Sequence, residues 1–224
     1  MGIPIPAVDH LAALARLSHI LKEGVMLRIL FRSQTFIRTL ALFAVLPGIL
    51  AAAAPAKAQE WAVDKASTQI TFEGTAGGQT ISGLFKEYQI EVHFDPDEPK
   101  EADIAAAIDL NSISTGQSQV DRTLAGAEWF NTETYPVASF RAVAVKRAGE
   151  DKYEMRADLT IKGTTKRITV PFTLDVKKGE AMARAEIVIN RLDFRVGPSG
   201  PVAGAVVDDQ VKVVITAAGK RLDN

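Results

Sequence analysis

The sequence predicts an all-β protein, an antiparallel up-and-down β-barrel of about eight strands with one short helix. Beyond residue 58, apolar residues recur with a period of two, most clearly over Tyr153–Ile161 and Ile168–Val176. This period gives each strand one apolar and one polar face, as is typical of antiparallel sheets. Short connections with turn residues, such as Lys162-Gly163 and Lys178-Gly179, separate the strands. Closing such a meander into a barrel removes its exposed edges.

The same alternation predicts the remaining strands of the barrel. Four further segments show it: Ile70–Phe72, Tyr88–Phe94, Ala181–Ile189 and Val211–Ile215. Gly77-Gly78 supplies another tight turn. Pro171 lies inside a predicted strand, where it cannot donate a ladder hydrogen bond, so it indicates a barrel rim or a bulge at that point.

One helix is expected beyond residue 58, from Ser118 to Trp129. Ser118 is suited to cap this helix, and Asp121 to complete a weak capping box. A partial apolar stripe leads to the aromatic pair Trp129-Phe130, and Tyr135-Pro136 then forces extended backbone. We expect the helix to lie over one end of the barrel, where its aromatic residues either fill the core or wall one end of a ligand channel.

The first 58 residues have the features of a leader that is removed. Arginines precede an apolar segment, Thr39–Ala54, and Ala56-Lys57-Ala58 provides the small residues of a cleavage site. We therefore expect cleavage after Ala58, secretion, and a single mature domain of residues 59–224. Met26 is expected to be the true start, which makes residues 26–58 the signal peptide. An uncleaved anchor is the alternative, although the apolar run is short for a spanning helix.

Composition argues against several function classes. The chain has 26 basic and 27 acidic residues, and six of the basic and two of the acidic ones precede residue 59. The mature part therefore carries 20 basic and 25 acidic residues, a charge that disfavours nucleic acid as a partner. There is no cysteine, and His93 is the only histidine beyond residue 58. We expect His93 to face solvent on its strand, with no metal site and no cofactor.

The carboxylates do not form a recognisable catalytic pattern. Asp95, Asp97, Glu98 and Glu101 cluster among prolines and indicate a solvated loop, with a weak calcium site as the alternative. Nothing in the sequence pairs a nucleophile with a base, so no enzymatic activity is expected.

Eight short motifs, in order along the chain, resemble those of one known family. They are Trp61-Ala62-Val63-Asp64, Gly83-Leu84-Phe85, Phe94-Asp95-Pro96, Ser112-Ile113-Ser114-Thr115, Leu124 with Glu128-Trp129-Phe130-Asn131, Tyr135-Pro136 with Phe140, Asp158–Lys166, and Arg191-Leu192-Asp193-Phe194. Together they resemble the YceI-like, polyisoprenoid-binding, lipocalin-like proteins of the bacterial periplasm. The resemblance covers roughly Trp61 to Ala217. It implies a periplasmic barrel that encloses a long isoprenoid or acyl chain, such as a quinone tail, without catalysis.

The chain departs from the family pattern at two places. The short helix has Val120 and Thr123 where the family often has Arg and His, and Arg195 follows the Asp-Phe pair where a glycine is usual. The first change removes polar groups near one end of the barrel, and the second adds a charge beside a loop. The polar end of the ligand is therefore expected to differ from that of other members.

An apolar interior also fits a ligand tunnel on physical grounds. Small inward residues leave space: Ala142, Ala144, Ala157, Ala183 and Ala185. Empty space is costly in a packed core, whereas a hydrocarbon chain gains about 0.8 kcal/mol per buried methylene before ordering costs. The alternative is that the alanines only fit the taper of the barrel. The residues expected to contact the ligand are Phe72, Phe85, Tyr88, Ile90, Val92, Trp129, Phe130, Phe140, Tyr153, Met155, Leu159, Phe172, Leu174 and Phe194.

Two other functions stay open at this point. The barrel could be a lipid-free scaffold whose loops dock a membrane redox partner, such as a quinone or cytochrome system. Alternatively, an enzyme acting on an apolar substrate would need a buried polar pair, for which Tyr88 and Arg141 are the candidates. A homodimer is also left open.

Overall fold

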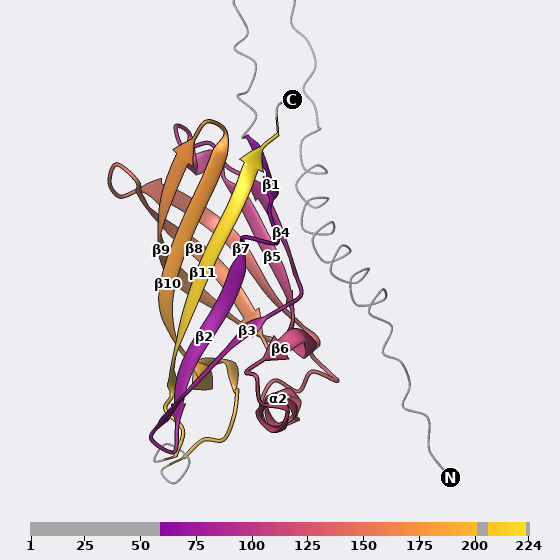
Figure 1. The fold of residues 1–224 in the computed structure, drawn as a ribbon. Helices are drawn as coiled ribbons and strands as arrows, with labels where there is room; N and C mark the ends of the chain where they lie inside the picture. The colour runs from indigo at the N-terminus through magenta and orange to yellow at the C-terminus, as the bar shows by residue number, and fades with distance from the viewer. Residues whose placement is uncertain (1–58, 201–205, 223–224) are drawn as a thin grey trace, which may run out of the picture.

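The computed structural model describes residues 59–200 and 206–222 (Figure 1). The predicted leader and its cleavage site, apart from Gln59, lie outside the described residues. The strands are β1 (Glu60–Val63), β2 (Gln69–Ala76), β3 (Gln79–Phe85), β4 (Tyr88–His93), β5 (Asp103–Asp109), β6 (Ile113–Ser114), β7 (Val137–Arg147), β8 (Lys152–Ile161), β9 (Thr164–Lys177), β10 (Glu180–Asn190) and β11 (Gln210–Arg221). Between them lie the 3₁₀ turns η1 (Pro99–Glu101), η2 (Leu110–Ser112) and η3 (Arg191–Phe194), and the helix α2 (Ser118–Ala125).

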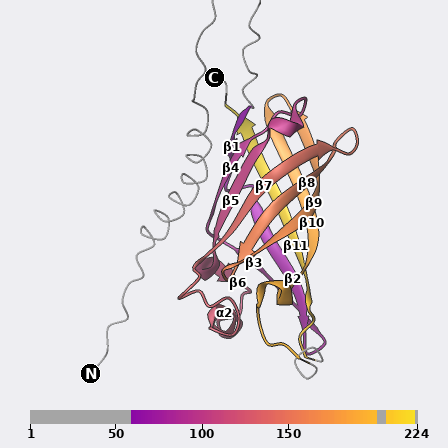
Figure 2. The same cartoon turned by 180° about the vertical axis from the view of Figure 1, so that it is seen from behind.

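The strands form a closed antiparallel barrel, as predicted. Neighbours follow the order β1-β4-β5-β7-β8-β9-β10-β11, and pairing of β1 with β11 closes this ring of eight. The other part of β11 pairs with β2, which continues to β3 and β6. Along the chain, β1 is followed closely by β2, β3 by β4, and β5 by β6. Each of these pairs therefore forms one kinked strand of the wall, and the path of the chain remains up-and-down (Figures 1 and 2).

The tight turns have the backbone that their sequences indicate. Both residues of Gly77-Gly78, Lys162-Gly163 and Lys178-Gly179 have positive φ. Two consecutive residues with positive φ match the twist of a two-residue hairpin, and glycine adopts this conformation at little cost. The three hairpins therefore join neighbouring antiparallel strands directly.

Aromatic packing fills the barrel end that carries the C-terminal end of β11, the upper end in Figure 1. Trp61, Phe94 and Tyr153 belong to a buried cluster there. The Trp61 indole Nε1 donates a hydrogen bond of 2.8 Å to the Phe94 carbonyl. The Tyr153 ring stacks on Phe172 with centroids 5.2 Å apart. These contacts pack aromatic rings into the interior near the upper end of the barrel.

The helix α2 lies at the opposite, lower end (Figures 1 and 2), but it is shorter than predicted and begins differently. Its N-cap is Gln117, which makes no side-chain capping bond, so the prediction that Ser118 caps the helix is wrong. Asp121 instead accepts hydrogen bonds from the Thr115 amide and hydroxyl, at 2.8 and 2.6 Å. No helix in the described ranges is long and apolar enough to span a membrane.

Pro171 lies neither at a rim nor at a bulge, which corrects the prediction for this residue. It lies in the middle of β9 opposite Glu154, and the irregularity in register is in β7 instead. The ladder between β9 and β10 ends at the pair Phe172–Ala185, one residue from the proline. Below that point the two strands separate, and η3 packs against β9 with Phe194 buried. The missing N–H of Pro171 is tolerated because no β10 partner is needed there.

Candidate functional site

A cavity of about 540 Å³ lies inside the barrel. Its volume is within the range of roughly 300–1,000 Å³ found for small-molecule sites. Inward residues from most strands line it, together with α2 and η3. It extends from the lower end up to Leu174, Ala183 and Ala217, and Phe94 and Phe172 of the upper aromatic packing also line it. The cavity can therefore hold an elongated molecule along the barrel axis.

Twelve of the fourteen residues expected to contact a ligand line this cavity. They are Phe72, Phe85, Ile90, Val92, Trp129, Phe130, Phe140, Met155, Leu159, Phe172, Leu174 and Phe194. Strand alternation places most of them on the inner face, since residues two apart in a strand share a face. Trp129 and Phe130 line the cavity near its lower end.

The glycine of the Gly-x-Phe motif shapes this wall. Gly83 pairs with Phe72 across β2 and β3, and a Cβ atom on Gly83 would lie 2.6 Å from the Phe72 ring. The ring therefore lies over the bare backbone, with its centroid 5.7 Å from that of Phe85. Phe85 in turn meets Phe130 edge-on at 6.3 Å. A larger residue at position 83 would displace this row of rings.

Tyr88 and Tyr153 do not line the cavity. Tyr88 is buried where β1 gives way to β2, and its hydroxyl donates to the Thr68 carbonyl at 2.7 Å. Burial raises the pKa of the Tyr88 phenol. Tyr153 belongs to the upper cluster, stacked on Phe172 and below the Arg147 guanidinium. Both side chains seal the wall or the end of the barrel.

Only some of the five inward alanines line the cavity. Ala183 and Ala185 of β10 line the cavity, and they leave the space that their size predicts. Ala157 is fully buried in the upper cluster, and Ala142 packs against that cluster. Ala144, beyond the irregularity in β7, is not part of the lining. The expectation that all five alanines open the tunnel therefore holds only for the pair on β10.

Four exposed lining residues mark the mouth of the cavity. Gln119 and Thr123 lie on α2, Thr75 at the end of β2, and Asp208 just before β11. All four are polar, and every other described lining residue except Arg191 is apolar or glycine. The mouth therefore opens at the lower end, and polar groups are confined to it. No local pattern in the sequence indicates that Gln119 and Asp208 line the same cavity.

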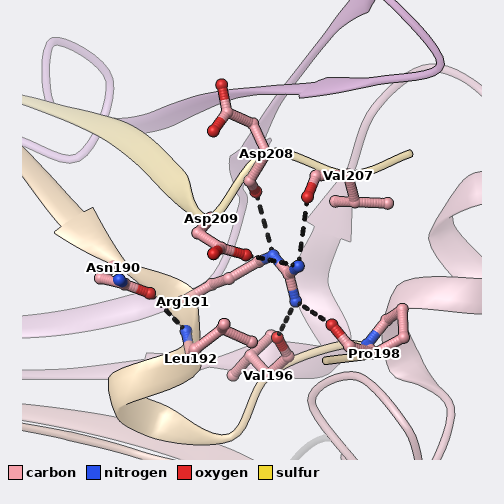
Figure 3. Close-up of polar contacts among 8 residues, drawn as sticks. All are labelled: Asn190, Arg191, Leu192, Val196, Pro198, Val207, Asp208 and Asp209. Carbon is pink, nitrogen blue, oxygen red and sulfur yellow. Dashed lines mark hydrogen bonds and ion pairs between the residues drawn. The ribbon is translucent and has the colours of Figure 1, made fainter. Parts of the chain in front are cut away.

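Arg191 is a buried cation beside the mouth, and its role was not predicted. It is 3% exposed, and its guanidinium donates to four backbone carbonyls: those of Val196, Pro198, Val207 and Asp208, at 2.7–3.2 Å (Figure 3). It also bonds the Asp209 carboxylate at 2.8 Å. The sequence signal was the Arg191-Leu192-Asp193-Phe194 motif, but the carbonyl partners come from a loop that folds back.

A second cation ties the lower loops together. The Lys162 ammonium, at the β8–β9 turn, donates to the carbonyls of Glu128 and Arg195, each at 2.9 Å. Burial lowers the pKa of Lys162. Gly197 has a φ of +76°, and a Cβ atom at this position would lie 2.9 Å from the Trp129 ring. The absence of a side chain therefore leaves room for that ring. The segment after α2, η3 and the β8–β9 turn thus form one floor under the cavity.

The polar pair considered for catalysis is not formed. Arg141 lies on the outer face, where it bonds Asp103 at 3.0 Å, and Tyr88 bonds Thr68 instead. The acidic loop after β4 is held locally, by an Asp95 carboxylate that accepts from the Asp97 amide at 2.9 Å. Within the described ranges, no group of three or more His, Cys, Asp or Glu side chains is placed to hold a metal.

Sequence comparisons identify related proteins. The family described as YceI-like domain matches residues 61–218. A UPF0312 protein of Pectobacterium carotovorum is 30% identical over 187 residues, which cover 77% of this chain and 92% of that protein. A UPF0312 protein of Photorhabdus laumondii is 36% identical over 92 residues, which cover 41% of this chain but only about half, 47%, of that relative.

Solved structures share the fold. BcnA of Burkholderia cenocepacia superposes with a TM-score of 0.67 at 29% identity, covering 70% of this chain and 99% of that one. A domain of Saccharophagus degradans described as polyisoprenoid-binding has a TM-score of 0.58 at 16% identity, covering 74% of this chain and 99% of that one. At that identity the second likeness concerns the fold alone.

Proposed function

Because this chain belongs to the YceI-like domain family, we propose that its barrel binds and carries one long apolar chain. The ligand classes that suit the site are a polyisoprenoid, the tail of an isoprenoid quinone and a fatty-acyl lipid. The observation that carries the proposal is the lining of the cavity: its polar side chains are four exposed residues at the mouth and one buried arginine whose hydrogen bonds are already made.

The energetics favour a long chain over a compact ligand. Each methylene buried in such a cavity gains about 0.8 kcal/mol. Association costs roughly 4–15 kcal/mol in lost translational and rotational freedom. Burial of about ten methylenes gains about 8 kcal/mol, which offsets only the lower half of that range. Tight binding therefore requires a chain well beyond ten carbons.

The proposed location is the periplasm, and the leader supports it. A basic segment, an apolar segment and Ala56-Lys57-Ala58 precede the barrel in the sequence. A carrier that shields an apolar chain is needed in the water between two membranes. A domain of Saccharophagus degradans with the same fold is described as polyisoprenoid-binding, which is consistent with a carrier role.

The direct test is the lipid content of the protein. We would purify the mature protein from periplasmic extract without detergent, extract it with organic solvent and identify the extract by mass spectrometry. We expect close to one long-chain lipid per barrel, and rebinding of that lipid to the stripped protein. A protein that carries no lipid and rebinds none would refute the carrier function and favour a lipid-free scaffold.

A further inference from the structure

We infer that the ligand ends in an uncharged polar group, such as a hydroxyl, an amide or a quinone carbonyl, and not in a phosphate or carboxylate. This inference rests on the proposed function and specifies the ligand class of the same cavity. It follows from the charges that meet at the mouth.

The one cation in the described lining is not available to a ligand. A guanidinium has five N–H donors. Those of Arg191 are engaged by four backbone carbonyls and Asp209, and Figure 3 shows these partners surrounding the group. Its aliphatic part can contact an apolar chain, but a phosphate oxygen would have to displace a carbonyl or Asp209 to be bound.

The helix at the mouth presents no cation to the cavity either. Val120 and Thr123 line the cavity on α2, together with Gln119. Arg122 is exposed, is not part of the lining, and donates to the Gln119 side-chain oxygen at 2.6 Å. Asp121, in the first turn, offsets the positive end of the helix dipole.

The charge that does face the mouth is negative. Asp208 lines the cavity and is exposed, and its carboxylate points away from Arg191, whereas its backbone carbonyl accepts from Arg191 (Figure 3). Like charges repel, and the repulsion is stronger beside an apolar wall than in free water. An anionic head group at this mouth would meet Asp208 without an available cation in the described lining, whereas the polar side chains of Thr75, Gln119 and Thr123 can hydrogen-bond an uncharged one.

The test compares two ligands that share one chain. A C20 isoprenoid alcohol and its monophosphate would compete for the stripped protein at pH 8, where the phosphate is close to a dianion. We expect the alcohol to bind about tenfold more tightly, which corresponds to ~1.4 kcal/mol, with a smaller difference at high salt. Equal or tighter binding of the phosphate would overturn the inference while leaving the carrier function intact. Binding of neither ligand would overturn both.

Charge variants test the cause. Asp208→Asn keeps the backbone carbonyl that Arg191 uses, so we expect tighter phosphate binding and unchanged alcohol binding. Val120→Arg places a cation in the mouth and should reverse the preference. Ser118→Arg adds the same charge at an exposed helix position outside the lining, and should leave the preference as in the wild type. If the wild type binds the phosphate tightly and Arg122→Ala abolishes that binding, the outer face of α2 supplies the cation and the inference fails.

Discussion

A phenylalanine at Ala185 tests whether the cavity is a ligand site or a packing defect. Ala185 lies on the inner face of β10, paired with Phe172 on β9, and lines the cavity. A ring placed there has space to enter, so the stripped Ala185→Phe protein should keep its stability to within about 1 kcal/mol. The same ring removes room for the chain. If it displaces about three methylenes at ~0.8 kcal/mol each, the dissociation constant should rise about 50-fold.

Ala157→Phe is the matched control. Ala157 is an inward alanine of β8, but it is fully buried in the upper aromatic cluster and does not line the cavity. The same ring would overpack that cluster and cost roughly 1–3 kcal/mol. For a domain of this size the cost corresponds to a melting temperature lower by roughly 2–12 °C. Ligand affinity of the protein that remains folded should change little.

The assay is thermal unfolding of both stripped variants, followed by titration with the lipid found in the wild type. Stripped protein is required because bound ligand itself raises the melting temperature. The cavity is not the ligand site if Ala185→Phe is destabilised as much as Ala157→Phe and still binds the lipid with wild-type affinity. That result would mean that the space beside Ala185 closes in solution.

Three further predictions concern the wall of the barrel, the buried Tyr88 between β1 and β2, and the floor under the cavity. Leu174→Lys should lose the lipid or unfold, because its charge enters the apolar cavity. Thr173→Lys on the outer face should keep its lipid and should change the free energy of unfolding by no more than about 0.5 kcal/mol. The deciding measurement is the lipid content of the folded fraction. Tyr88→Phe should cost about 1 kcal/mol near neutral pH through its lost hydrogen bond to Thr68. Because burial raises the pKa of Tyr88, the wild type should lose stability as the pH rises above about 10, the ordinary pKa of a tyrosine, and the variant should lose less; parallel urea curves from pH 8 to 11 would contradict this. Arg191→Met should cost about 3 kcal/mol or more in thermal unfolding, because buried carbonyls and a carboxylate lose their partner; a variant as stable as the wild type would show that water replaces the guanidinium.

Much of the wall could be predicted from strand alternation. When apolar residues recur at every second position, the sequence shows which face of the sheet each residue occupies. Phe172 and Leu174 were assigned correctly to the inner face on this basis. Alternation does not state how closely the interior is packed around a residue. Tyr153 and Ala157 also face inward, yet they are buried in the aromatic cluster and do not line the cavity, although Met155 between them does. Sequence alone could not divide the interior into a filled part and an open part.

The mouth could not be predicted because it is assembled from distant segments. Gln119 and Asp208 are 89 positions apart and line the same cavity only because of the way the chain folds. Arg191 was visible as part of a motif, but its carbonyl partners lie on both sides of a loop whose path no local pattern specifies. The departures at Val120 and Thr123 did point to this end of the barrel, and both residues line the cavity.

The seam between β9 and β10 has a consequence for how the barrel moves. These strands share a ladder of six residue pairs, Glu180–Ala185 with Phe172–Lys177, whereas β10 and β11 share eleven. Below Pro171 the two walls are joined by side chains rather than by a ladder, so this is where transient opening should cost least and amide hydrogen exchange should be fastest. A chain that fills the interior contacts both walls at once and acts as a staple across the seam. A bound chain would then join β9 and β10 where no backbone ladder connects them.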